Sequence, residues 1–134
     1  MNFQAVKSLE SQNRIIPIVG DFAGAKALHS VGMYVREHGA TVSAFYTSNV
    51  EFYLFQTDDW RKFLETISDF PLNSETVVIR SYFNNYGMQF PTPPGWLYSS
   101  PPSYTLLDNL SGYTHAFSAG RIQSYFDVIR RSKP

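Results

Sequence analysis

The sequence predicts an α/β fold in which helices cover both faces of a mostly parallel sheet. Its first part indicates a β-α-β-α-β core from Arg14 to Ser81, because short apolar runs alternate with amphipathic segments of helical spacing. A Pro- and aromatic-rich segment and a C-terminal helix follow this core. The length of 134 residues fits a single domain over residues 1–134, which can bury an ordinary core without disulfides or metal.

The first predicted strand is the continuous apolar run from Ile15 to Val19. Such a run is typical of a parallel strand that is covered on both faces. Pro17 has no backbone N–H to donate to a neighbouring strand. We therefore expect this strand either to lie at an edge of the sheet or to begin regular pairing at Ile18.

A helix and a second strand are predicted next. Apolar residues at helical spacing predict a helix from about Ala23 to His38. Gly39 supplies the residue that commonly ends a helix in the left-handed conformation. The β-rich run from Thr41 to Tyr46 predicts the second strand and completes a βαβ unit.

Two further helices and a third strand complete the predicted core. Ser48 and Glu51 have the spacing of a capping box, which predicts a helix directly after the second strand. A longer helix is expected after the acidic residues that follow Thr57, and it should end near Pro71. The run from Thr76 to Ile79 predicts the third strand, with right-handed crossovers between the strands.

The region between Arg80 and Arg121 differs from the rest, since Asp108 is its only charged residue and nine aromatic residues crowd it. Five of the eight prolines fall between Pro91 and Pro102, which disfavours regular structure there. We expect residues 82–113 to form an ordered loop, packed over the sheet or against a partner. A closing helix is predicted from about Thr114 to Arg131.

Charge and composition argue against several classes of protein. The 11 basic and 11 acidic residues give a formal net charge of zero, so the basic footprint of a nucleic-acid-binding protein is missing. No window approaches the roughly 20 apolar residues of a membrane span. Without cysteine, thiol catalysis, thiolate zinc sites and disulfides are excluded. The first residues lack the apolar stretch of a secretory signal, so a cytoplasmic protein is expected.

Candidate binding residues lie where the three predicted strands end, because ligands of open parallel sheets bind outside the carboxyl ends of the strands. No motif identifies a catalytic residue, and His29, His38 and His115 lack the spacing of metal ligands. The arrangement offers carboxylates, a hydroxyl, an amide and a guanidinium to a small polar molecule. The candidate ligand-binding residues are Asp21 and Gly24 at the first strand end, Ser48, Asn49 and Glu51 at the second, and Arg80 at the third.

Each candidate also has a structural explanation, and both explanations stay open. Asp21 fits a helix cap and Gly24 a close-packing position, while Ser48 and Glu51 fit a capping box. Arg80 follows an apolar run and needs a partner for its charge. That partner is either an anionic ligand or an internal carboxylate, Asp21 or Glu51.

Three runs of the sequence carry a resemblance to a known family: IIPIVGDFAGAKALHSVGMYVREHGATVSAFYTSNVEFYLFQ, VVIRS and AGRIQSYFDVIR. They resemble an uncharacterised family of bacterial proteins of more than twice this length. In those proteins the segment is similar to the C-terminal half of a Rossmann-like unit of class I S-adenosylmethionine-dependent methyltransferases. The resemblance implies a Rossmann-like fold and S-adenosylmethionine as candidate cofactor. The N-terminal half, which would supply a glycine-rich cofactor loop, has no counterpart here, so no cofactor-binding residue is assigned.

Two functions are compatible with the sequence. The first is the ligand-binding or catalytic part of a methyltransferase-like protein, with a polar pocket at the carboxyl ends of the strands. The second is a non-catalytic interaction or oligomerisation module, in which the charge-poor aromatic segment and an open sheet edge dock onto a partner. The partner would be a second copy, with Trp96 and Tyr98 as anchors, or the missing N-terminal half.

Overall fold

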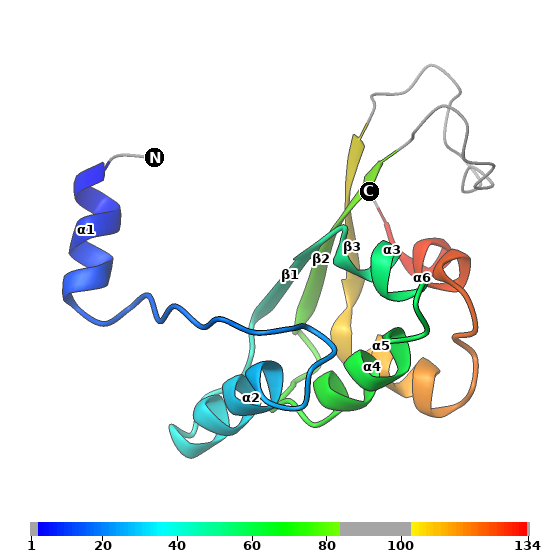
Figure 1. The fold of residues 1–134 in the computed structure, drawn as a ribbon, viewed down its shortest axis with the longest axis horizontal. Coiled ribbons are helices and arrows are strands. Elements are labelled where there is room, and N and C mark those ends of the chain that lie inside the picture. The colour runs from blue at the N-terminus through cyan, green and yellow to red at the C-terminus, as the bar shows by residue number, and fades with distance from the viewer. Residues whose placement is uncertain (1–2, 84–102, 134) are drawn as a thin grey trace.

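The computed structural model describes residues 3–83 and 103–133 of the chain. Its strands form one sheet in the order β1-β2-β3, with β1 at Ala44–Ser48, β2 at Val77–Phe83 and β3 at Ser103–Asn109. The helices of the described residues are α1 (Phe3–Ser11), α2 (Ala27–Glu37), α3 (Val50–Leu54), α4 (Trp60–Ser68), α5 (Leu110–Ser118) and α6 (Tyr125–Arg131). Figure 1 shows α3 to α6 gathered on one side of the sheet, while α1 stands apart at the end of an extended segment.

The sheet is mixed, so the prediction of a mostly parallel sheet with helices on both faces was wrong. β1 runs parallel to β2, but β2 pairs antiparallel with β3 along its whole length. β3 lies within residues 82–113, which we expected to form a loop. Its residues alternate between buried and exposed sides, so this part of the charge-poor region is a half-buried strand. Trp96 and Tyr98, the expected anchors, lie outside the described residues.

Within the described residues, only one face of the sheet packs against helices. This inner face carries Phe45, Thr47, Val78, Arg80, Tyr82, Tyr104, Leu106 and Asp108, and the helices α3 and α5 contact it. The outer face carries the alternate residues of each strand, and Tyr46 and Leu107 on it are 61% and 43% exposed. The described residues therefore form two layers, a sheet and one layer of helices, where the sequence predicted three.

The helix α4 follows the sequence prediction closely. It begins at Trp60 and ends at Ser68, before Pro71. One face of the helix is buried in the core, where the Trp60 ring stacks on Phe55 with centroids 4.7 Å apart. The apolar spacing located this helix because a single face of it meets the core. Its buried residues are Trp60, Phe63, Leu64 and Ile67.

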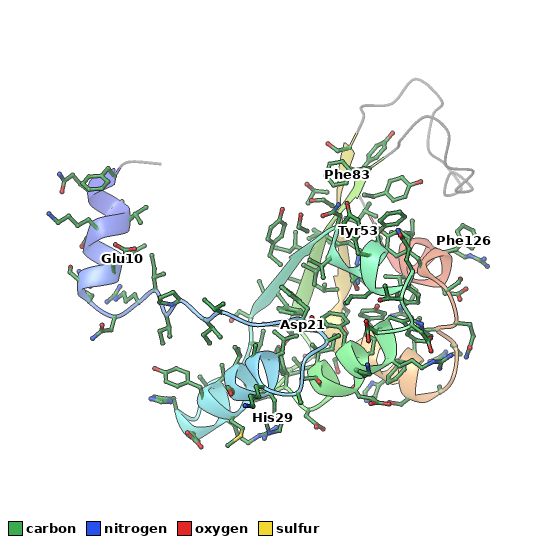
Figure 2. All side chains as sticks on the ribbon, viewed as in Figure 1. Glu10, Asp21, His29, Tyr53, Phe83 and Phe126 are labelled. Atoms are coloured by element: carbon green, nitrogen blue, oxygen red, sulfur yellow. The ribbon has the colours of Figure 1, made fainter. Side chains whose placement is uncertain are left out.

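The apolar run from Ile15 to Val19 is not a strand. Residues 15–20 are exposed, make no hydrogen bond with the described chain, and include a Val19 that is 100% exposed. An apolar run becomes a strand only where another strand accepts its backbone groups, and Pro17 removes one donor. Figure 2 shows the side chains between Glu10 and Asp21 standing away from the other elements.

The predicted helix and second strand exist, but both begin later than expected. The helix α2 starts at Ala27 instead of near Ala23, because residues 21–24 form a turn. In this turn the Ala23 N–H donates to Asp21 Oδ1 at 3.0 Å, and the Gly24 N–H donates to the Asp21 carbonyl at 3.2 Å. The strand β1 starts at Ala44 and extends to the residue before Asn49.

The predicted closing helix is two helices, α5 and α6. Gly120 has φ of +67°, in the left-handed region that ends a helix, and α5 stops just before it. Ser124 then caps α6 in a capping box with Asp127. The apolar spacing over this stretch did not reveal the break, because both helices bury one face in the same core.

The left-handed conformation of Gly120 gives a testable expectation. Gly120→Ala should lower the free energy of unfolding by about 1–2 kcal/mol, because a Cβ disfavours positive φ while no neighbour lies within 4 Å of it. Gly120→Asn is the matched control, since Asn tolerates this conformation better. Urea denaturation followed by circular dichroism measures both. Equal losses for Ala and Asn would contradict the strain explanation.

Candidate functional site

A buried cluster of charged side chains lies on the inner face of the sheet. Glu51 comes from α3, Arg80 from β2, Asp108 from β3 and Arg131 from α6. Glu51 is 1% exposed and Arg80 is completely buried. We call these four residues the ionic cluster. Buried charges require partners, so the geometry of the cluster shows which groups neutralise the charge of Arg80.

The guanidinium of Arg80 forms a two-pronged ion pair with the carboxylate of Glu51. Arg80 Nε donates to Oε2 at 2.7 Å and Nη2 donates to Oε1 at 3.2 Å. The remaining terminal nitrogen, Nη1, donates to Ser132 Oγ at 2.5 Å and lies 3.8 Å from Asp108 Oδ2. The ring of Tyr113 lies 5.0 Å from the guanidinium carbon. The guanidinium is therefore surrounded by protein groups.

Thr47 and the other two residues of the ionic cluster, Asp108 and Arg131, extend this network. Thr47 Oγ1 donates to Glu51 Oε2 at 3.1 Å, from the strand β1. Asp108 accepts a hydrogen bond from Arg131 Nε at 3.1 Å. All three strands and the helices α3 and α6 thus contribute a polar group to one connected set. Such a fully connected set fixes the positions of the elements that carry it.

The position of Glu51 depends on the turn between β1 and α3. The register of β1 against β2 shifts between Tyr46 and Ser48, and Ser48 has φ of +52°. The expected capping box is not formed: Asn49 is the N-cap and its side chain makes no capping hydrogen bond. Glu51 is therefore released from a capping role, and its carboxylate binds Arg80.

Electrostatics fix the charge states within the cluster. Burial by itself would lower the pKa of Arg80, but the Glu51 carboxylate outweighs it and the pKa is raised. Burial raises the pKa of Asp108, and the charges of Arg131 and Arg80 offset part of this effect. The buried hydroxyl of Tyr113 has no hydrogen-bond partner among the described residues, and burial, followed by the Glu51 charge, raises its pKa well above the usual value. At neutral pH, Arg80 stays cationic and Tyr113 stays neutral.

The predicted site residues fall into separate places. Glu51 and Arg80 form an ion pair in the ionic cluster. This pair is one of the two internal pairs of Arg80 that the sequence analysis left open. Asp21 and Gly24 line an open hollow of about 510 Å³ at the start of α2. No interaction of the described residues links them to the cluster. Whether any of these residues binds a ligand stays a prediction.

Ser48 and Asn49 lie at the junction of β1 and α3. Both are half-buried, and neither is among the groups that contact Arg80. The six predicted residues therefore do not line one common pocket in the described structure. The reason is that Glu51, which was expected to cap a helix or face a ligand, turns inward to Arg80.

Four residues of the site were not singled out from the sequence. They lie on β3, on the last two helices or just beyond α6, in a region that was expected to be a loop and one helix. A signal for one of them was present, because Asp108 is the only charge between Arg80 and Arg121. A lone carboxylate in such an apolar stretch needs a buried cation. The four residues are Asp108, Tyr113, Arg131 and Ser132.

Two further observations concern metal binding and membrane spans in the described residues. Within residues 3–83 and 103–133, no group of three or more histidine, aspartate or glutamate side chains is placed to bind a metal ion. In the same residues, no helix combines the length and apolar character needed to cross a membrane.

The ion pair between Arg80 and Glu51 predicts a large cost for removing one partner. Arg80→Met should lower the free energy of unfolding by about 3–5 kcal/mol, because it leaves the Glu51 carboxylate buried without its cation. Lys62→Met is the control: it removes an exposed pair with Asp59, at 2.8 Å, and should cost far less than Arg80→Met, because solvent screens the exposed charges. Denaturant titration measures both losses.

A double variant keeps this expectation testable if Arg80→Met does not fold. Glu51→Gln combined with Arg80→Met removes both charges and should regain much of the lost stability. Circular dichroism reports whether each variant folds. A loss for Arg80→Met as small as that for Lys62→Met would contradict a structural role for the pair.

Comparison with known proteins gives a family but no activity. Residues 1–125 match a family described as a domain of unknown function, DUF7790. No curated protein matches the chain. The predicted likeness to methyltransferases is untested by these comparisons. Because the match extends over most of the chain, including β1 to β3 and the helices between them, the chain belongs to the DUF7790 family.

Proposed function

We propose that the chain is a non-catalytic oligomerisation module, in which two copies associate through the open side of the sheet. The observation that carries this proposal is the apolar outer face. Tyr46 of β1 lies beside Ile79 of β2, and Ile79 lies opposite Leu107 of β3. These side chains form a row across all three strands, and its two ends are strongly exposed.

Sheets with one solvated face normally place polar residues on that face. This outer face carries the apolar row beside polar residues such as Ser81 and Thr105. Val77 lies on the same face of β2, and Phe83, beyond Ser81, is 44% exposed. Large exposed apolar patches mark surfaces that associate with other molecules. We therefore assign the outer face to a contact between protein chains.

A second copy is a suitable partner for this face. Two identical apolar surfaces can cover each other about a two-fold axis, which is the commonest arrangement of soluble oligomers. The formal net charge of zero means that two copies do not repel each other over long distances. Neither observation requires another protein or a ligand.

The ionic cluster favours this function over ligand binding. A ligand site at Arg80 requires the guanidinium to face an open pocket. Instead, Glu51 takes two of its nitrogens, and Ser132 takes the third. The open hollow at the start of α2 is lined by Asp21 and Gly24 and also by the apolar side chains of Ile18 and Val19. The cluster is better explained as part of the fold.

Self-association should depend on the outer face. Tyr46→Lys should weaken the dimer at least about tenfold, because it places a charge in the proposed contact. Tyr53→Lys is the matched control, because Tyr53 is 57% exposed, close to Tyr46 in exposure, but lies on α3, which packs against the inner face (Figure 2). Analytical ultracentrifugation across the micromolar range measures both. A wild-type chain that stays monomeric throughout would reject the proposal.

The methyltransferase-like alternative has its own test. Isothermal titration of the chain with S-adenosylmethionine should give no heat of binding at millimolar ligand, since Glu51 and Ser132 occupy the guanidinium of Arg80, the candidate anion-binding group. A saturable heat that Asp21→Ala abolishes, while Asp69→Ala preserves it, would contradict the non-catalytic assignment and support a ligand site at the start of α2.

A further inference from the structure

We infer that the N-terminal arm of one copy adds a fourth strand to the free edge of β1 in a second copy. The arm is the segment Phe3–Gly20, which consists of α1 and the extended residues 12–20. This inference rests on the proposed self-association and names the segment that performs it. Three observations carry it: the exposed apolar arm, the unpaired strand edge and the direction in which the arm leaves the domain.

The arm exposes side chains that a folded chain normally buries. Ile15, Ile16, Ile18 and Val19 are all at least 40% exposed in a single copy. The helix α1 contains no buried residue. Burying apolar side chains stabilises an assembly, so an uncovered run of this kind is a strong candidate for a contact surface. The arm also has unused hydrogen-bonding capacity, because residues 15–20 bond to no described part of the chain.

The sheet offers one fully unpaired edge in the described residues. β2 is the central strand, and β1 pairs with it on one side only. The far edge of β3 is partly occupied, because Leu107 exchanges two backbone hydrogen bonds with Lys133, at 2.7 and 2.8 Å. An exposed strand edge is a template for pairing with another chain. The edge of β1 is therefore the place where a further strand fits.

The sequence of the arm suits an edge strand. In an extended chain, alternate N–H groups point to the same side. If Pro17 directs its missing donor toward solvent, Ile16 and Ile18 direct their N–H groups toward β1, so the proline costs no hydrogen bond in the sheet. Both faces of the added strand are apolar, so one of them extends the apolar outer face that begins at Tyr46.

The base of the arm directs it away from its own domain. A Cβ on Gly20 would overlap the Cβ of Ala27, so the chain passes tightly against the first residue of α2. From there the arm runs outward, and α1 lies apart from the sheet and from the other helices (Figure 1). A strand held away from its own sheet is available to the identical sheet of a second copy. Exchange of identical elements is a low-cost route to a dimer.

Reciprocal exchange also accounts for a closed assembly. When each copy gives its arm to the other, both arms and both β1 edges are used, so the exchange is complete with two copies. The family match covers residues 1–125 and so includes both the arm and the sheet.

A pair of proline variants tests the pairing. Ile18→Pro removes an N–H that the inference directs toward β1, and it should weaken the dimer at least about tenfold. Val19→Pro is the matched control: its N–H points the other way, so dimerisation should change little. Both positions are exposed in the single copy, so neither variant should shift the unfolding transition of the monomer. Ultracentrifugation of the full chain gives the dissociation constants.

Hydrogen exchange supplies a second measurement on the wild-type chain. The amides of Ile16 and Ile18 should be protected at protein concentrations where the dimer forms and should exchange freely where it dissociates. A dimer that Ile18→Pro leaves intact would overturn the exchange of arms but keep the oligomerisation function. A monomer whose arm amides are protected would show that the arm pairs with β1 of its own chain, and it would overturn both the exchange of arms and the oligomerisation function. A monomer with an unprotected arm would also overturn both.

Discussion

The ion pair between Arg80 and Glu51 connects the central strand of the sheet to the helix layer. Arg80 lies in the middle of β2, where a guanidinium without partners would be very costly to bury. Glu51 must therefore reach it from α3, and the irregular turn at Ser48 is the backbone conformation that delivers it. The same guanidinium bonds Ser132, just beyond α6. The placement of the helices on the inner face thus depends on one charged side chain.

This one-sided arrangement leaves the outer face of the sheet uncovered and the edge of β1 unpaired in the described residues. The helices satisfy the inner face, while the row that contains Tyr46 and Leu107 meets solvent on the outer face. The edge of β1 also ends the described sheet without a neighbour. A single copy of the described chain therefore exposes an apolar face, a strand edge and an apolar arm at the same time. The association of two copies that we propose would use all three together.

Local sequence patterns predicted the elements whose environment is local. The helix α4 was found from its apolar spacing, and β1 and β2 were found from their apolar runs, with ends displaced by a few residues. The direction and partner of a strand depend on distant residues, so β3 was missed although it alternates regularly. The prediction of a strand from Ile15 to Val19 was wrong, because an apolar run carries no information about whether a partner strand is present. Arg80 and Glu51 were expected at the site, but the further partners of Arg80, Asp108 and Ser132, depend on tertiary packing.

The position of the cluster's members along the sequence has a consequence for synthesis of the chain. Glu51 and Arg80 leave the ribosome well before Arg131 and Ser132, which lie beyond the part matched by the family. Until those last residues emerge, Asp108 has only Arg80 as a cationic neighbour within the cluster, and β3 lacks its backbone bonds to Lys133. The nascent domain can assemble β1 and β2 around the first ion pair. It acquires the final contacts of β3 only when the C-terminal residues are released.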